Sequence, residues 1–341
     1  MTTEHTTDRF IIGQGEAFRI AENLGVNLAG RRIAVVTDRE VSALHMDAFL
    51  QPLTNAGARC FPIIVEAVGS AKSLDTVKTA ISQLADNGFS QGDLLIGLGG
   101  GGVLDVAAFC ARIYRGGLTY IRVPTTLYAM VALRGGECAC LNFAGSKDVL
   151  SIPGSQEMSI VDPYFLETLS KRQYANGIAE IVRMAFLTDP SLLEQLESGE
   201  GTREGLMRHA IAAADMAQAG NAALLGFGRQ AGDVIEEHFR FIKYTYGEVC
   251  ALGMMAVSPT PRLATVLERF GLPIRLEGVG AETLSRKMVK AFYQAGGNAD
   301  GLEKECTQVV IASEPGFPTL LSVPREEADA WFAAAVAHIA G

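Results

Sequence analysis

The sequence predicts an α/β protein in which an N-terminal domain built on a parallel sheet is followed by a mostly helical C-terminal domain. Through the first 150 residues, short runs rich in β-branched residues alternate with segments of helical spacing. Those runs are apolar almost throughout, which is typical of parallel strands covered by helices on both faces. Beyond residue 150, helical spacing dominates. We therefore predict two domains, residues 1–150 and residues 151–341.

The individual elements follow from apolar spacing and from breaker residues. Strands are expected at residues 32–38, 59–65, 93–98 and 119–123. Helices are expected after the first three of them, at about residues 39–55, 73–89 and 103–114. In the second half, helical spacing recurs at residues 172–187, 205–219, 229–241, 249–270 and 282–295. A strand pair at residues 307–312 and 319–323 then precedes a terminal helix.

The composition argues against several classes of function. The net charge is −9 and no block of like charges occurs, so a nucleic-acid-binding surface is not expected. No apolar run is long enough to span a membrane, and the polar N-terminus does not resemble a signal peptide. The six cysteines are scattered, mostly within apolar segments, which favours reduced thiols. We therefore expect a cytoplasmic protein with a small-molecule partner.

Four consecutive glycines, residues 99–102, follow the strand expected at residues 93–98 and precede a helix. Glycines at such a place let a pyrophosphate approach the free N–H groups of a helix N-terminus, although they could equally form a tight turn. Thr125 and Thr126 follow the next expected strand, at the edge where parallel sheets bind ligands. Asp38 ends the first strand, where it could accept hydrogen bonds from a ribose or cap the following helix.

Several segments, taken in chain order, resemble the dehydroquinate synthases and related sugar-phosphate cyclases. The first are GGGGVLD at residues 99–105, YRG at 114–116, VPTTL at 123–127 and AMV at 129–131. GSKD at residues 145–148 is similar to the family's Gly-Lys-Asn, and GIAEIVR at 177–183 is similar to its Ala-Glu-Val-Ile-Lys helix. LGFGRQAGDVIE at residues 225–236 and YGEVCALGM at 246–254 fall on two segments that contain histidines in the family.

The resemblance implies an N-terminal Rossmann-like domain that binds NAD, a helical C-terminal domain and a homodimer. Family members oxidise a carbinol transiently with NAD, eliminate phosphate, reduce the ketone again and close a ring, while zinc polarises the carbinol oxygen. By resemblance, the cofactor-binding positions of this chain are Asp38, Lys72, Gly99, Gly100, Gly101, Asp105, Thr125 and Thr126.

The resemblance also implies that most of the zinc site has been lost. Glu180 falls on one of three zinc ligands, but Arg229 and Tyr246 fall on the two histidines. Arginine is permanently cationic and cannot ligate zinc, and a carboxylate with a phenol makes a poor zinc site. We therefore expect no zinc, and we expect Arg229 to form a bidentate ion pair with Glu180. This pair could also be only the structural repair of an inactive site.

Cationic residues at the remaining positions point to an anionic substrate. Arg115, Arg134 and Arg183 are the candidate substrate-binding residues, and in the family the arginine at the position of Arg115 reaches a neighbouring subunit. The candidate catalytic residues are Glu180, Tyr246, Lys147 and Arg229. Without a metal, Tyr246 or Lys147 could act as the acid or base. Tyr246 could instead form a hydrogen bond in the core.

Three hypotheses about function stay open at this point. The chain could be a metal-independent enzyme that uses NAD on a different anionic polar molecule, in a specialised biosynthetic pathway. It could be a sugar-phosphate cyclase with an altered metal site. It could also be a catalytically inactive NAD-binding partner subunit. Metal content separates the second hypothesis from the others, and a substrate screen for NADH formation or phosphate release separates the first from the third.

Overall fold

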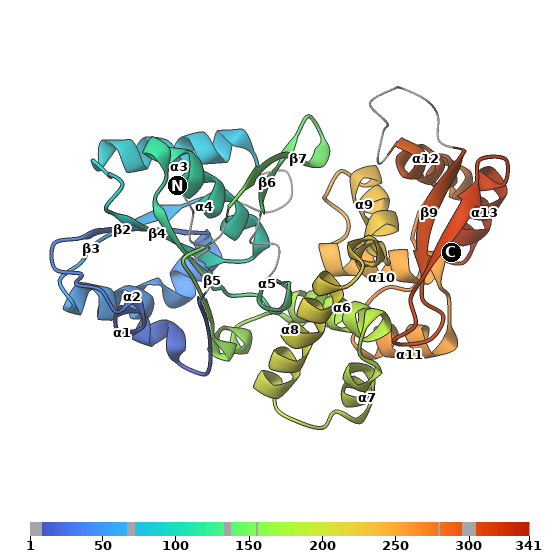
Figure 1. Cartoon of the computed structure of the whole chain (residues 1–341), viewed down its shortest axis with the longest axis horizontal. Coiled ribbons are helices and arrows are strands. Elements are labelled where there is room, and N and C mark those ends of the chain that lie inside the picture. Colours follow the sequence, from blue (N-terminus) through green and yellow to red (C-terminus); the bar gives the residue numbers. More distant parts are fainter. Residues whose placement is uncertain are drawn as a thin grey trace. The chain divides into compact units, whose positions relative to one another are not determined.

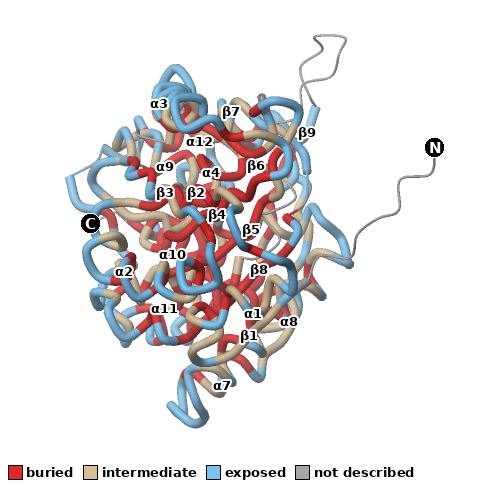
Figure 2. The backbone as a smooth tube through the Cα atoms, turned by 90° about the vertical axis from the view of Figure 1, so that its left-hand side faces the viewer, coloured by how far each residue is buried: buried red, intermediate tan, exposed pale blue. Residues whose placement is uncertain are grey.

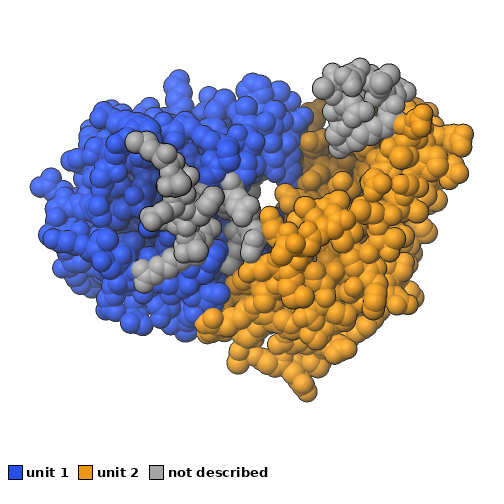
Figure 3. Space-filling model, in the orientation of Figure 1, with its two compact units in different colours: residues 1–170 blue, residues 171–341 orange. Residues whose placement is uncertain are grey.

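The computed structural model describes residues 9–66, 72–132, 138–154, 156–278, 280–294 and 305–340. The chain divides into two compact units, residues 1–170 and residues 171–341 (Figure 3). The predicted boundary after residue 150 lies earlier than this division. The difference arises because strand β8 (Met158–Val161) pairs with two strands of the first unit and so belongs to its sheet.

The first unit is built on a parallel sheet of six strands in its described part. The strand order is β1-β8-β5-β4-β2-β3, and every pairing within the sheet is parallel. Besides β8, the strands are β1 (Arg9–Ile12), β2 (Arg32–Thr37), β3 (Arg59–Ile64), β4 (Leu94–Gly99) and β5 (Thr119–Pro124). Figure 2 shows β2, β4 and β5 as buried, which explains their nearly continuous apolar sequences. The predicted α/β class is confirmed.

Helices connect these strands (Figure 1). They are η1 (Glu16–Arg19), α1 (Ile20–Leu24), α2 (Arg39–Asn55), α3 (Leu74–Asp86), α4 (Gly101–Ile113), η3 (Tyr114–Gly116), α5 (Leu127–Val131) and η5 (Pro163–Glu167). α3 and α4 contribute Val77, Leu84 and Val106 to one core that also contains Ala34 and Val36 of the sheet. The alternation of strands and helices places α4 directly after the central strand β4.

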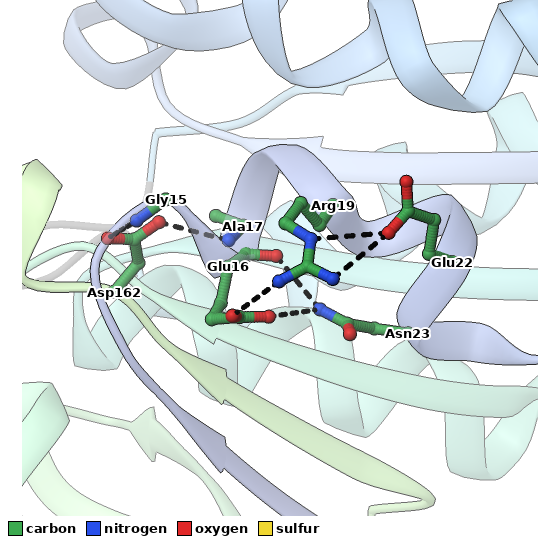
Figure 4. Close-up of polar contacts among 7 residues, drawn as sticks. All are labelled: Gly15, Glu16, Ala17, Arg19, Glu22, Asn23 and Asp162. Atoms are coloured by element: carbon green, nitrogen blue, oxygen red, sulfur yellow. Dashed lines mark hydrogen bonds and ion pairs between the residues drawn. The ribbon is translucent and has the colours of Figure 1, made fainter.

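Asp162 ties the N-terminal part of the first unit to the end of β8. Its carboxylate accepts hydrogen bonds from the backbone N–H groups of Gly15, at 3.0 Å, and Ala17, at 2.9 Å (Figure 4). Because Asp162 is completely buried, these bonds satisfy a charge that would otherwise be costly. Asp162 therefore fixes η1 against the sheet from a distant position in the sequence.

An antiparallel hairpin of β6 (Cys138–Phe143) and β7 (Ser146–Pro153) also belongs to the first unit. The apolar spacing predicts neither this hairpin nor β1 and β8. β1 and β8 have only four residues each, and β7 is half exposed, so none of them produces a long apolar run. The hairpin lies against α4, where the backbone N–H of Cys140 donates to a carboxylate oxygen of Asp105 at 3.5 Å.

The second unit is mostly helical, as predicted. Its helices are α6 (Lys171–Leu187), α7 (Pro190–Ser198), α8 (Arg203–Ala219), η6 (Ala222–Gly226), α9 (Arg229–His238), α10 (Tyr246–Val257), α11 (Pro261–Arg269), α12 (Ala281–Gln294) and α13 (Ala328–Ala337). β9 (Cys306–Ile311) and β10 (Thr319–Pro324) form an antiparallel pair. The single helix expected at residues 249–270 is two helices, because Pro261 starts a new one. Within the described ranges, no helix has the length and apolarity that a membrane crossing requires.

Candidate functional site

The glycine run forms a very short turn between β4 and α4. β4 ends at Gly99 and Gly100 is the N-cap residue, and no side chain among the described residues caps the helix that begins at Gly101. A Cβ atom on Gly100 would lie 3.2 Å from Cγ2 of Thr126, and one on Gly99 would lie 2.7 Å from Cβ of Val103. The uncapped first turn of α4 therefore offers backbone N–H groups to an anion, as predicted for a pyrophosphate.

Two buried threonine hydroxyls flank this turn. Thr37 ends β2 and Thr125 follows β5, and the side-chain oxygen of each has no hydrogen-bond partner within the described ranges. Thr125 is held beside the turn because its backbone N–H donates to the carbonyl oxygen of Gly99 at 3.0 Å. Buried hydroxyls normally have partners, so these two suit a site that receives polar ligand atoms. Thr126 is the N-cap residue of α5, where its hydroxyl accepts from the N–H of Ala129 at 3.2 Å.

Asp38 caps α2, which was one of its two predicted roles. One of its carboxylate oxygens accepts a hydrogen bond from the backbone N–H of Val41 at 2.8 Å. The other oxygen accepts no hydrogen bond from the described residues. A contact of that oxygen with a ribose therefore stays a prediction.

Lys72 and Asp105, two predicted cofactor residues, pair with each other. The Nζ atom of Lys72 lies 2.7 Å from Oδ2 of Asp105 and 2.6 Å from Oδ1 of Asp148. Asp105 is the fifth residue of α4, because the helix begins at Gly101 rather than at about residue 103. Asp148 was not predicted as a site residue, because its partners are distant in sequence. These three ionisable side chains form what we call the lysine–aspartate cluster.

The cluster has altered proton affinities. Burial alone would lower the pKa of Lys72, but the adjacent Asp105 and Asp148 raise it above the ordinary value for a lysine. Burial raises the pKa of Asp105, and Lys72 only partly opposes this effect. The ammonium is therefore held charged between two carboxyl groups.

In the second unit, the partner of Glu180 is Arg183 rather than the predicted Arg229. Nε and Nη2 of Arg183 donate to the two carboxylate oxygens of Glu180 at 2.9 and 2.6 Å. Nη1 of Arg183 donates to the carbonyl oxygen of Leu225 at 2.7 Å. Both charged side chains are buried, with 5% of each exposed. The prediction was wrong because Arg183 lies on the same helix as Glu180, one turn away, and makes a bidentate bridge without any help from α9.

Arg229 and Tyr246 nevertheless lie near this pair, at the starts of α9 and α10. Burial would raise the pKa of Glu180, but Arg183 and then Arg229 hold that pKa below its ordinary value. Tyr246 is close enough to influence Arg183 electrostatically. Of the other predicted catalytic residues, Arg229 and Tyr246 therefore lie near the Glu180–Arg183 pair in the second unit.

Glycines allow α9 and α10 to pack closely enough for this arrangement. A Cβ atom on Gly232 of α9 would lie 2.7 Å from the carbonyl oxygen of Val249 in α10. A Cβ atom on Gly253 of α10 would collide with the carbonyl oxygen of Gly228. These glycines therefore let α9 and α10 pack in close, antiparallel contact.

The donor atoms near Glu180 do not fit a zinc ion. Both carboxylate oxygens of Glu180 already accept from Arg183, and Arg229 has no electron pair to offer a metal. Zinc in proteins is bound by several nitrogen, sulfur or carboxylate ligands. In the ranges that the structure describes, no group of three or more histidine, cysteine, aspartate and glutamate residues is arranged to hold a metal ion.

The remaining predicted residues have different outcomes. Lys147 is half-buried in β7, next to Asp148 of the lysine–aspartate cluster. Arg115 is exposed in η3, in a left-handed backbone conformation with a φ angle of 46°. Arg134 lies outside the described residues. The guanidinium of Arg183, predicted to bind substrate, is occupied by Glu180 and Leu225.

Comparison with known sequences identifies the family. A family model described as 3-dehydroquinate synthase N-terminal matches residues 62–176. The 3-dehydroquinate synthase of Latilactobacillus sakei subsp. sakei (strain 23K) is 31% identical over 314 residues, which are 86% of each chain. The chain belongs to the 3-dehydroquinate synthase family. The relationship suggested by the sequence motifs is therefore confirmed.

Solved structures place this family member in the expected fold. The 2-epi-5-epi-valiolone synthase ValA from Streptomyces hygroscopicus subsp. jinggangensis 5008, with NAD+ and Zn2+ bound, superposes with a TM-score of 0.82 at 21% identity over 97% of both chains. A 2-deoxy-scyllo-inosose synthase complexed with carbaglucose-6-phosphate, NAD+ and Co2+ gives a TM-score of 0.77 at 16% identity, over 95% of this chain and 96% of that one. At these identities the two structures establish the dehydroquinate synthase-like fold of the chain.

Proposed function

We propose that this member of the 3-dehydroquinate synthase family binds NAD and acts without a metal ion on an anionic polar small molecule. We further propose that the reaction belongs to a specialised biosynthetic pathway and is not standard dehydroquinate synthesis. The observation that carries the proposal is the occupation of both Glu180 carboxylate oxygens by Arg183, at 2.9 and 2.6 Å.

The first unit supports the NAD part of the proposal. The uncapped N-terminus of α4 suits the pyrophosphate, and Asp38 has a carboxylate oxygen left for a ribose. The unpartnered hydroxyls of Thr37 and Thr125 suit further polar atoms of the dinucleotide. Both solved structures described above contain NAD+. When bound, NAD supplies a hydride acceptor.

The second unit supports the metal-free part. Each carboxylate oxygen of Glu180 keeps a lone pair beside its hydrogen bond, but a metal ion bound there would lie next to the buried guanidinium of Arg183, which repels a dication. The nearby Arg229 adds a second positive charge, which opposes the binding of a dication. A guanidinium therefore supplies the positive charge that a metal ion would otherwise bring to this place.

Cationic side chains support an anionic substrate. Lys147 and Arg115 of the first unit and Arg229 of the second are the candidates to attract it. A sugar-phosphate analogue is bound in the 2-deoxy-scyllo-inosose synthase structure. Without a metal, we propose that Tyr246 or Lys147 holds or moves the proton of the reacting hydroxyl group. We also propose a homodimer, in which Arg115 reaches the neighbouring subunit.

A sugar-phosphate cyclase with an altered metal site is the second candidate function. It is favoured by the name of the curated relative and by the Zn2+ and Co2+ in the two solved structures. Measuring the zinc and cobalt content of protein purified without chelators separates the two candidates. The proposal expects no stoichiometric metal and no loss of NAD affinity after dialysis against a chelator. Stoichiometric metal would overturn metal independence.

Calorimetric titration with NAD+ and a screen of anionic polyols and sugar phosphates test the remaining part. We expect NAD+ to bind, and we expect NADH formation or product release with at least one of these compounds when no metal is added. NAD+ binding without turnover of any compound would indicate an inactive NAD-binding partner subunit. Failure of NAD+ to bind would contradict the proposal at its first step.

A further inference from the structure

Tyr246 opens α10, which packs against α6 in the second unit, and its two neighbours in the chain are bound by one side chain of α6. Oδ1 of Asn176 accepts a hydrogen bond from Oγ1 of Thr245 at 2.5 Å. The same oxygen accepts a second one from the backbone N–H of Gly247 at 3.0 Å. The backbone is therefore held on both sides of Tyr246 by a single oxygen atom.

Gly247 lets the first turn of α10 lie directly on α6. A Cβ atom on Gly247 would collide with the Cα atom of Asn176 and would lie 2.7 Å from Oδ1 of the same residue. A residue larger than glycine would therefore push α10 away from α6 and lengthen both hydrogen bonds to Asn176. The distance between the two helices is set at this contact.

A second contact between α6 and α10 supports the same arrangement. Nε and Nη2 of Arg172 donate to the two carboxylate oxygens of Glu248, each at 2.7 Å. Glu248 also accepts from the backbone N–H of Thr245 at 2.8 Å, as part of a capping box with that residue. Arg172 precedes Asn176 by four residues and so lies on the same face of α6. Arg172 therefore holds the start of α10 as a whole, whereas Asn176 contacts the two residues that flank Tyr246.

The same face of α6 continues to the Glu180–Arg183 pair. Glu180 follows Asn176 by four residues, about one turn along the helix. Tyr246 is close enough to Arg183 to influence it electrostatically. A tyrosine side chain rotates about only two bonds, so the place of its phenol depends closely on the backbone that carries it. The contacts of Asn176 therefore bear on where the phenol of Tyr246 lies relative to Arg183.

We propose that Asn176 is a positioning residue for Tyr246, acting through Thr245 and Gly247. This inference rests on the proposed role of Tyr246 in holding or moving the proton of the reacting hydroxyl group. Such a transfer needs a heavy-atom distance of about 2.6 to 3.2 Å, so the start of α10 must be held within a small tolerance. An amide oxygen suits this task because it accepts two hydrogen bonds and adds no charge beside Glu180.

Fluorine NMR of the full-length chain labelled with 3-fluorotyrosine tests this inference without a substrate. The chain contains eight tyrosines, and the resonance of Tyr246 is the one that is missing from Tyr246→Phe. In Asn176→Ala, which removes the oxygen without adding bulk, we expect this resonance to shift or broaden. In Asn176→Asp, which keeps an acceptor oxygen at the same place, we expect it to return close to its wild-type position.

Asn221→Ala is the matched control. Oδ1 of Asn221 accepts from the backbone N–H of Ala223 at 3.1 Å, at the start of η6, and Asn221 is exposed. This variant removes the same kind of hydrogen bond elsewhere in the second unit, so the Tyr246 resonance should stay in place. Asn176→Leu, which has a side chain of similar shape and no acceptor, is a second variant in case Asn176→Ala does not fold.

Urea denaturation of the same variants separates positioning from stability. A purely structural role of Asn176 would lower the free energy of unfolding in Asn176→Ala and leave the Tyr246 resonance of the folded protein unchanged, which would overturn the inference. Failure of Asn176→Asp to restore the resonance would overturn it as well.

Turnover of a sugar phosphate found in the metal-free screen distinguishes this inference from the proposed function. We expect kcat of Asn176→Ala to fall about tenfold to a hundredfold, the effect of a misplaced reacting group, with little change in KM. If Tyr246→Phe turns the compound over as fast as the wild type does, the proposed role of Tyr246 fails. That outcome is distinct from a Tyr246 resonance that does not move in Asn176→Ala.

Discussion

Arg183 holds both carboxylate oxygens of Glu180 from one turn along the same helix, and both side chains are buried. The third contact of Arg183, to the carbonyl oxygen of Leu225, anchors the segment that leads into α9. The pair therefore connects α6 to the region where Arg229 and Tyr246 begin their helices. A fixed cation at this place therefore balances the charge of the buried Glu180 carboxylate within the second unit.

Removing one partner of this pair should strongly destabilise the protein. For Glu180→Gln we expect a loss of about 3 to 5 kcal/mol in the free energy of unfolding, because a buried guanidinium loses its counter-charge. Urea denaturation at pH 7 measures this loss. Arg262→Met is the matched control, since Arg262 makes the same bidentate contact with Glu197 at a more exposed position and should cost no more than about 1 kcal/mol. Similar losses of unfolding free energy in Glu180→Gln and Arg262→Met would contradict the expectation that a buried ion pair is more costly to break than an exposed one.

The pair should also make stability depend on pH in the acid range. The pKa of Glu180 is lower in the folded protein than in the unfolded chain, so its contribution is complete above the unfolded value, about 4.3, and is lost as the pH falls through the folded value. We expect the difference in unfolding free energy between wild type and Glu180→Gln to shrink as the pH is lowered from 7 to 3. Urea denaturation at several pH values checks this. A constant difference would show that the carboxylate charge is not the cause.

The sequence predicts the local parts of the site well. Buried, β-branched strands followed by glycine or threonine place Gly99, Gly100 and Thr125 at one edge of a parallel sheet, and the structure does the same. The capping alternative for Asp38 follows from its position before a helix and is also observed. These features depend on neighbouring residues, which sequence patterns describe directly.

The contacts between distant segments could not be predicted in the same way. Asp148 meets Lys72 across 76 positions of the sequence, at an irregularity in the β6–β7 register that no periodicity indicates. The predicted partner of Glu180 was wrong for a different reason. The three-residue spacing of Glu180 and Arg183 on one helix allows an ion pair. The resemblance to the family instead favoured Arg229, because it falls on a histidine that binds zinc there. The spacing of residues within α6 is therefore what indicates the observed partner, Arg183.

Thr125 should contribute to cofactor binding more than to folding. Thr125→Val keeps the shape of the side chain and removes a buried hydroxyl that has no partner in the described part of the chain. We expect the free energy of unfolding to stay the same or rise slightly, because no hydrogen bond is lost on the unliganded protein. Binding of NAD+ should weaken about threefold to tenfold, the effect of one lost hydrogen bond.

Calorimetric titration and urea denaturation of Thr125→Val separate these two effects. Ser159→Ala is the control, because Ser159 also has a buried hydroxyl without a partner in the described ranges, but it lies within β8, away from the glycine turn. Equal NAD+ affinities of the two variants would show that the hydroxyl of Thr125 does not face the cofactor.

Gly100 should be the most sensitive position of the proposed pyrophosphate site. Its φ angle of −75° suits any residue, so Gly100→Ala should fold, with its new methyl group 3.2 Å from Cγ2 of Thr126. That methyl group would occupy the space through which a pyrophosphate reaches the first N–H groups of α4. We expect NAD+ binding to weaken on the order of tenfold or more, measured by calorimetry. Gly92→Ala, at an exposed glycine with no atom near its added Cβ, should bind NAD+ like the wild type. Unchanged affinity of Gly100→Ala would mean that the pyrophosphate does not bind at this turn.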